Sequence, residues 1–230
     1  MRRSLTAWEA QIANVEILYG RLLEAYGPQN WWPAETPFEI AVGAILVQRT
    51  AWHNAERALA SLRRQNLIEP DALSQTDPAV LRELIRPAGF ASAKGQYLQA
   101  LAAFFIDGGG LERLSSLETR QLRGQLLAVR GVGPETADSI LLYLFDRPVW
   151  VRDAYAERLL ERLSGTRGNK VSQDELVCGW VRTQRTQELR ELHALIVEHG
   201  KVHCRAVAVC RGCPLLPLCA HGAQALQSVS

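Results

Sequence analysis

Residues 126–145 read LLAVRGVGPETADSILLYLF, which is two helical blocks joined by a Gly-Val-Gly break. Glycine tolerates backbone conformations that other residues avoid, so Gly131 and Gly133 can form a sharp turn. Pro134 then starts a second helix well, because a first-turn residue leaves its N–H unpaired in any case. Apolar side chains recur at helical spacing along one face of that helix: Ala137, Ile140, Leu141 and Leu144. The pattern predicts a helix–hairpin–helix unit over residues 121–145.

The segment after this unit predicts a short link and a further helix. Pro148 ends the preceding helix, and residues 149–151 have an extended, apolar character. Asp153 stands directly before a helix whose apolar face is formed by Ala156, Leu159, Leu160 and Leu163. Aspartate is a good N-cap residue, so this position has a purely structural explanation. Upstream, Thr36-Pro37-Phe38-Glu39 is typical of another helix start, and the apolar run to Leu46 predicts a buried central helix.

The composition is that of an ordinary globular protein. The chain has 230 residues, 47% of them apolar and 22% charged, which suits one large or two small domains. Almost every segment has helical periodicity, so we expect an all-α fold. Residues 40–47 are the longest uncharged apolar stretch, too short for a membrane span, and Glu9 and Glu16 interrupt any signal peptide. We expect a cytoplasmic protein, and its net charge of +2 is compatible with nucleic acid without arguing for it.

Most of the cysteines crowd into one short region near the C-terminus: Cys204, Cys210, Cys213 and Cys219. In a chain without a secretory signal, such a cluster indicates a metal site rather than a disulfide framework. Four thiolates suit a tetrahedral zinc ion or a [4Fe–4S] cluster, and the spacing alone does not separate the two. Cys178 stands apart and is expected to be a buried core residue.

Residues 126–145 and 149–163 (VWVRDAYAERLLERL) together resemble the helix-hairpin-helix DNA glycosylases of the endonuclease III superfamily. The family pattern Gly-Val-Gly-x-x-Thr-Ala, followed by an acid, falls on Gly131, Val132, Gly133, Thr136, Ala137 and Asp153. The resemblance also covers residues 38–50, 89–94 and 199–219. It implies an all-α, two-lobed fold, with a six-helix barrel domain at residues 28–145 and an iron–sulfur cluster domain formed by residues 1–27 and 146–230.

The resemblance assigns the four clustered cysteines to a [4Fe–4S] cluster held by the loop 204–219, with zinc as the alternative. The family commonly has six residues between the first two ligands, whereas this chain has five. In the family the intervening loop is basic and contacts DNA. Here the loop is residues 205–209 and carries one charge, so the resemblance does not extend to that contact.

Removal of a base from its sugar builds positive charge on the sugar ring, and an ionised carboxylate stabilises that charge. Asp153 matches the family's acid, and an N-cap position is compatible with this role because a helix N-terminus keeps a carboxylate ionised. Family members that also cleave the strand carry a lysine where this chain has Glu135. A carboxylate cannot form a Schiff base. The resemblance therefore implies a monofunctional enzyme that uses water and does not catalyse β-elimination efficiently.

Residues 31–52 (WWPAETPFEIAVGAILVQRTAW) are similar to the 3-methyladenine glycosylase branch of the superfamily, in which aromatic residues at these positions sandwich a flipped base. Trp31, Trp32 and Trp52, together with Glu135, are therefore the candidates for the base pocket. Aromatic faces favour a cationic ring, such as an alkylated purine. At least one tryptophan is expected to be structural, and Trp31 is the first candidate for the core.

The same resemblance indicates which residues contact DNA. Gln48 matches the glutamine that fills the space left by the flipped base, and Arg49 stands where the alkylation branch usually has asparagine. Phe90 matches the residue that wedges the opposite strand, with a core position as its alternative. The Gly131-Val132-Gly133 hairpin either binds phosphate through backbone N–H groups or is a turn without a ligand. Lys94 is a candidate phosphate contact.

These residues predict a base-excision-repair glycosylase that acts as a monomer on double-stranded DNA containing a damaged base. The favoured substrate is an alkylated purine of the 3-methyladenine type. One alternative is an endonuclease III-type glycosylase and AP lyase for oxidised pyrimidines, and another is a non-catalytic binder of damaged DNA. DNA binding also implies association with the nucleoid.

Overall fold

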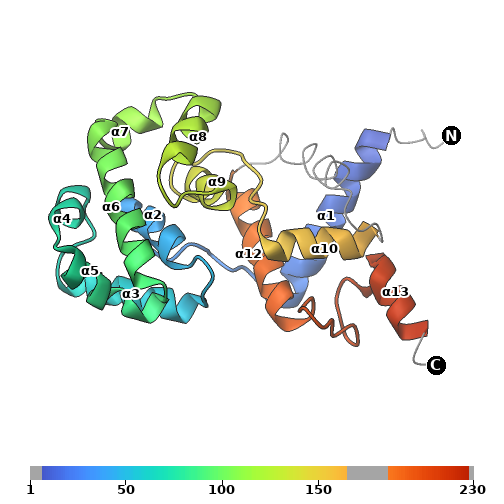
Figure 1. The fold of residues 1–230 in the computed structure, drawn as a ribbon. Helices are drawn as coiled ribbons and strands as arrows, with labels where there is room; N and C mark the ends of the chain where they lie inside the picture. Colours follow the sequence, from blue (N-terminus) through green and yellow to red (C-terminus); the bar gives the residue numbers. More distant parts are fainter. Residues whose placement is uncertain (1–6, 165–185, 228–230) are drawn as a thin grey trace. The chain divides into compact units, whose positions relative to one another are not determined.

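The structure is a computed structural model that describes residues 7–164 and 186–227 (Figure 1). Within these ranges every regular element is a helix, so the prediction of an all-α fold is confirmed. None of the helices in these ranges is both long and apolar enough to cross a membrane. Cys178 lies outside the described residues, and its place in the core stays a prediction.

The chain divides into two compact units, one of residues 32–147 and the other of residues 1–31 with 148–230. The first unit contains α2 (Pro37–Leu46), α3 (Trp52–Arg64), α4 (Pro70–Gln75), α5 (Pro78–Leu84), the 3-10 turn η1 (Arg86–Ala88), α6 (Ala91–Asp107), α7 (Gly110–Ser115), α8 (Thr119–Ala128) and α9 (Pro134–Tyr143). Helix α2 packs against α3, α6 and α9, and nearly all of its residues are buried. The prediction of a buried central helix therefore holds.

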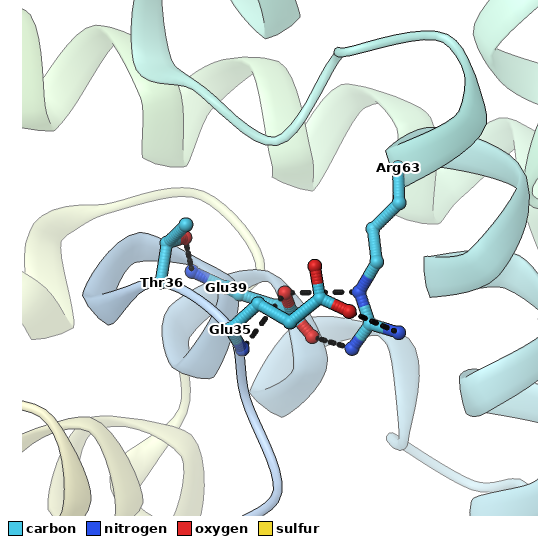
Figure 2. A network of polar contacts seen from close by, with 4 residues as sticks. All are labelled: Glu35, Thr36, Glu39 and Arg63. Carbon is cyan, nitrogen blue, oxygen red and sulfur yellow. Dashed lines mark hydrogen bonds and ion pairs between the residues drawn. The ribbon is translucent and has the colours of Figure 1, made fainter.

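The start of α2 shows how a buried charge is accommodated (Figure 2). The Thr36 hydroxyl accepts the N–H of Glu39 at 3.3 Å, as the cap predicts. The Glu39 carboxylate reaches back to the N–H of Glu35 at 3.3 Å rather than to that of Thr36. Glu39 is only 1% exposed, and both of its carboxylate oxygens accept from Arg63 of α3. Because a buried carboxylate needs such partners, this network ties the segment before α2 to α3.

The predicted helix–hairpin–helix unit corresponds to α8 and α9. Helix α9 begins at Pro134, as predicted, and α8 ends at Ala128, before the Gly-Val-Gly break. The two helices pack against each other, and α9 also packs against α2. The hairpin is therefore packed against α2, which is itself almost entirely buried.

The second unit contains α1 (Ala7–Tyr26), α10 (Ala154–Ser164), α12 (Thr186–Val202), the 3-10 turn η2 (Leu216–Leu218) and α13 (Ala220–Gln227). Helix α12 packs against α1 and α10, and α13 packs against α10. The Tyr155 ring lies so close to Gly200 of α12 that an added Cβ atom would come within 2.2 Å of it. Glycine at this position therefore allows α10 and α12 to approach.

Candidate active site

The two glycines of the hairpin have different physical roles. Gly131 has φ +87°, and a Cβ atom added there would lie 2.1 Å from the ring of Tyr97. Gly133 has the ordinary backbone angles φ −89° and ψ 178°, with open space where a Cβ would stand. Of the two glycines, only Gly131 therefore uses the backbone freedom that glycine offers. Gly133 is the N-cap of α9 without a side chain, which leaves the helix N-terminus accessible to an anion.

Two polar links hold the hairpin in shape. The Gln48 side-chain amide donates to the backbone oxygen of Gly131 at 2.9 Å and to the Thr136 hydroxyl at 3.0 Å. Arg123 of α8 forms a bidentate ion pair with Asp138 of α9, at 2.6 and 2.9 Å. Bidentate pairs fix geometry as well as charge. Gln48 was expected to contact DNA, and the Arg123–Asp138 ion pair was not predicted, because no local pattern indicates that these two residues meet.

Lys94 is a structural residue, which corrects its assignment as a phosphate contact. It is 2% exposed, and its ammonium donates to the backbone oxygens of Leu46 and Ala88, each at 2.8 Å. Burial lowers the pKa of the Lys94 ammonium to about 8. Lys94 shares the buried face of α6 with Leu98 and Leu101, four and seven residues on, and this spacing was the signal that could have indicated burial.

Phe90 lies at the surface, 62% exposed, at the start of α6. This position agrees with the wedge expectation and not with its alternative, a place in the core. Its φ is +49°, a left-handed conformation that is strained for a bulky side chain. The exposed Arg49, also left-handed with φ +55°, places its guanidinium carbon 5.3 Å from the centre of the Phe90 ring.

Trp32 and Trp52 lie together in the unit of residues 32–147. Their rings meet edge to face with centroids 5.4 Å apart, and Trp32 meets Tyr143 of α9 in the same way at 5.3 Å. The absence of a side chain at Gly43 leaves room for the Trp32 ring, which lies 3.2 Å from the position of an added Cβ. Trp31, expected as the first candidate for the core, and Trp32 are both half-buried. Neither is a fully buried core residue.

The remaining candidate for the base pocket, Glu135, is exposed in the first turn of α9. An acidic side chain in the first turn interacts favourably with the helix dipole, which is reason enough for its presence there.

Asp153 is 8% exposed and caps α10, since its Oδ1 accepts the N–H of Ala156 at 2.7 Å. Its Oδ2 lies 3.5 Å from Nε2 of His193 on α12. Burial alone raises the pKa of this carboxyl, but the hydrogen bond and charge of His193, with the N–H groups of Ala156 and Tyr155, outweigh it and hold the pKa below its usual value. The cap and an ionised carboxylate therefore coexist, as the sequence analysis expected.

His193 was not among the residues that the sequence indicated. It is 7% exposed and lies on the buried face of α12, one turn from Leu189 and from Ile196. A histidine on such a face is usually a core residue, so its spacing alone gives no hint of a partner. Only the packing of α10 against α12 brings it to the carboxylate of Asp153.

The four clustered cysteines line a single pocket, together with His199, His203 and Arg162. None of the four forms a disulfide, and Cys204 is the buried one. In the described ranges, no three His, Cys, Asp or Glu side chains are already arranged as a closed metal site. Four free thiols on one pocket are nevertheless the donor set that a [4Fe–4S] cluster or a zinc ion requires.

Polar groups around this pocket face the sulfur atoms. A guanidinium nitrogen of Arg162 donates to Sγ of Cys204 at 3.2 Å, and the N–H of Gly222 donates to Sγ of Cys219 at 3.4 Å. Donors of this kind stabilise thiolates, so the surroundings fit a thiolate-bound centre.

His199 connects the pocket to α1. Its Nδ1 lies 2.9 Å from the hydroxyl of Tyr26, and its Nε2 lies 3.8 Å from Sγ of Cys213. Burial, together with the nearby His203, lowers the pKa of His199 to about 4, so the ring is neutral. This places His199 in a structural role beside the cysteines.

An all-helical fold that carries a glycine hairpin, a capped buried aspartate and a cysteine pocket defines a class of DNA-repair glycosylases. Three similar proteins are found, of which the second, at 22% identity, supports the fold alone. A Methanocaldococcus jannaschii protein named as a DNA repair glycosylase is 44% identical over 207 residues, covering 88% of this chain and 94% of its own. A trapped endonuclease III–DNA covalent intermediate matches with a TM-score of 0.76 at 22% identity, covering 97% and 100% of the two chains. H. pylori 3-methyladenine DNA glycosylase bound to 1,N6-ethenoadenine matches with a TM-score of 0.70 at 25% identity, covering 86% and 98%.

Residues 42–178, more than half of the chain, match the HhH-GPD superfamily of base excision DNA repair proteins. The chain belongs to this family, within the endonuclease III superfamily, and is a DNA N-glycosylase that binds DNA.

Proposed function

We propose that this protein is a monofunctional DNA glycosylase that hydrolytically removes an alkylated purine of the 3-methyladenine type from double-stranded DNA. The observation that carries the proposal is Asp153, a buried carboxylate at the start of α10 whose pKa is held below its usual value. A carboxylate that is ionised at neutral pH is what a reaction through a cationic sugar needs.

Asp153 acts through its charge rather than as a nucleophile. Oδ1 is engaged by the N–H of Ala156, and Oδ2 faces His193. An oxygen held in this way is a poor nucleophile, but its negative charge still stabilises positive charge that develops on the sugar. Because the depressed pKa also makes the carboxylate a weak base, its contribution to water activation is orientation more than proton removal.

The aromatic residues support a cationic base as substrate. Trp32 and Trp52 meet edge to face, so two indole rings lie together as candidates for stacking a flipped base. An alkylated purine carries positive charge, and indole faces attract cations more strongly than they attract neutral rings. Trp31 and Glu135 remain candidates for the same pocket.

Hydrolysis without strand cleavage is supported by the chemistry at position 135. Glu135 cannot form a Schiff base, and the buried amine of Lys94 is engaged by two backbone oxygens. The released product would therefore be an intact strand with an abasic site. Phosphates beside that site would bind the open N-terminus of α9 at Gly133.

The four pocket cysteines would hold a [4Fe–4S] cluster, which organises the C-terminal loop rather than taking part in base removal. Arg162 and the N–H of Gly222 would stabilise its thiolates. The alternative, zinc, has no visible absorption, so the colour and iron content of the purified protein decide between them. We also propose that the protein acts as a monomer and associates with the nucleoid through DNA binding.

A panel of duplexes tests the substrate and the reaction type together. The duplexes carry 3-methyladenine, another alkylated purine or thymine glycol, and an undamaged duplex is the control. Base release and strand scission are scored separately, and borohydride is used to trap any covalent adduct. We expect base release from alkylated purines, little scission and no trapped adduct. A trapped adduct, or release of thymine glycol alone, would indicate a glycosylase and AP lyase for oxidised pyrimidines. Binding of damaged DNA without any release would indicate a non-catalytic binder.

A further inference from the structure

Arg49 and Phe90 are two of the four exposed non-glycine residues of the 32–147 unit that have a left-handed backbone conformation, the others being Asn66 and Asp146. Arg49 lies in the turn that follows α2, with φ +55°, and Phe90 lies in the turn that precedes α6, with φ +49°. Neither residue is a glycine, so both conformations are strained. Strain of this kind persists where the surrounding structure enforces it, and it is concentrated at binding sites.

The side chains of these two residues form a pair. The guanidinium carbon of Arg49 lies 5.3 Å from the centre of the Phe90 ring, within the range of a cation–π contact. Within the part of the chain that the structure describes, no carboxylate lies within ion-pair distance of Arg49. The ring is therefore what orients the guanidinium, and the N–H groups at its edge stay available.

Lys94 fixes the distance between the two turns. Its ammonium donates to the backbone oxygen of Leu46, at the end of α2, and to that of Ala88, two residues before Phe90. In the first of these turns, Gln48 donates to the hairpin at Gly131. The Arg49–Phe90 pair is thus part of a preorganised surface and not a chance meeting of two mobile side chains.

We propose that Arg49 recognises the base opposite the damaged nucleotide and so sets the opposite-base preference of the enzyme. This inference rests on the proposed function and on the expectation from the resemblance that Phe90 wedges the opposite strand. A guanidinium that lies over the Phe90 ring would enter the duplex with it, and its N–H donors would meet the base that has lost its partner. Arg49 is therefore a specificity-determining residue.

The chemistry of the guanidinium predicts the order of preference. Arginine has five N–H donors and no acceptor, so it favours a base edge with two neighbouring acceptors. Guanine offers N7 and O6, and cytosine offers N3 and O2 on its pairing edge. On both its pairing edge and its major-groove edge, adenine places an amino donor beside a single acceptor, so adenine suits a guanidinium least. We expect guanine and cytosine to be preferred over adenine.

The test measures binding, so that it does not depend on base removal. The full-length protein is titrated with duplexes that contain a stable tetrahydrofuran abasic analogue opposite each of the four bases. We expect guanine or cytosine duplexes to bind at least about 5-fold more tightly than the adenine duplex, the lower end of what a good arginine–base contact contributes.

Four variants separate base recognition from general attraction to DNA. Arg49→Leu removes the guanidinium, Arg49→Lys keeps a charge without the planar donor edge, and Phe90→Leu keeps an apolar wedge without a ring. In all three, the guanine-to-adenine and cytosine-to-adenine ratios should fall to within about 2-fold, and Arg49→Lys should bind all duplexes more tightly than Arg49→Leu. Arg82→Leu, which removes an exposed arginine of α5, is the charge-matched control and should keep the wild-type ratios.

Two outcomes would overturn the inference. One is a wild-type protein that binds the four duplexes equally, and the other is an Arg49→Leu variant that loses affinity for all four but keeps their ratios, as a phosphate contact would. Base release from an alkylated duplex, measured on the same preparations, keeps the two proposals apart. Absence of release counts against the proposed function, whereas flat binding ratios count against the role of Arg49.

Discussion

Asp153 and His193 face each other where α10 packs against α12, with Oδ2 3.5 Å from Nε2 and both residues at least nine-tenths buried. This contact offsets the desolvation that would otherwise raise the pKa of Asp153. A depressed pKa means that the carboxylate is ionised, and contributes its stabilisation, at neutral pH. That contribution is lost only as the pH falls through the folded-state pKa.

Replacement of His193 by Phe should therefore make base release more sensitive to acid. Burial is the largest influence on the pKa of Asp153, and it raises that pKa. Without His193 to oppose burial, the pKa of Asp153 should be higher in the variant. We expect release at pH 5 relative to pH 7.5 to fall further in His193→Phe than in wild type, while His193→Gln, which keeps a donor, restores much of the ratio. A pH profile unchanged in His193→Phe would show that His193 is only a core residue.

Lys94→Met should change the pH dependence of stability at alkaline pH. The Lys94 pKa is lowered to about 8 in the folded protein and is about 10.5 when unfolded. Between these two pKa values the unfolded chain binds more protons than the folded protein. The free energy of unfolding of the wild type should therefore rise with pH relative to that of the variant, with no such trend below about pH 8. Urea unfolding of both proteins from pH 7 to 10.5 measures the difference. Parallel curves across that range would count against a buried ammonium.

The two hairpin glycines form a matched pair for mutagenesis. Gly131→Ala places a Cβ against Tyr97 in a left-handed backbone, and should cost at least about 2 kcal/mol of unfolding free energy. Gly133→Ala has open space and ordinary backbone angles, so it should unfold like wild type. If DNA approaches the start of α9, Gly133→Ala should still bind duplex more weakly. Equal stability losses in the two variants would contradict this division of roles.

Arg63→Met should destabilise the start of α2. The variant leaves Glu39 buried without the cation that both of its carboxylate oxygens contact (Figure 2). Because Arg63 is itself 31% exposed, the expected loss is about 2 kcal/mol, below the range for a fully buried pair. The double variant Arg63→Met/Glu39→Gln should recover part of this loss in denaturant unfolding, since it removes the uncompensated charge. No recovery would mean that Arg63 acts by packing alone.

Local signals predicted the elements well because their causes are local. Pro134 starts α9, Thr36 caps α2, and Asp153 caps α10, each within a few residues of its partner. Contacts between distant residues were not predicted. Arg49 and Phe90 are 41 positions apart, and Asp153 and His193 are 40 apart, so only the tertiary packing brings each pair together.

Lys94 shows how the sequence was misinterpreted. A lysine is usually exposed, and its assignment to a phosphate followed from that expectation. Its spacing to the apolar residues of α6 indicated the buried face, but spacing does not reveal that two helix-terminal carbonyl oxygens supply the compensating hydrogen bonds. The sequence therefore indicates where such a residue lies more readily than what it binds.

The most direct test of the account compares wild type with Asp153→Asn on a duplex that contains one alkylated purine. Asparagine also caps helices, so the variant should fold and should bind an abasic-analogue duplex with nearly wild-type affinity. Its single-turnover rate of base release should fall by at least about 100-fold, because the charge that stabilises the sugar cation is gone. Release by Asp153→Asn at a rate within a few-fold of wild type would contradict the role of this carboxylate.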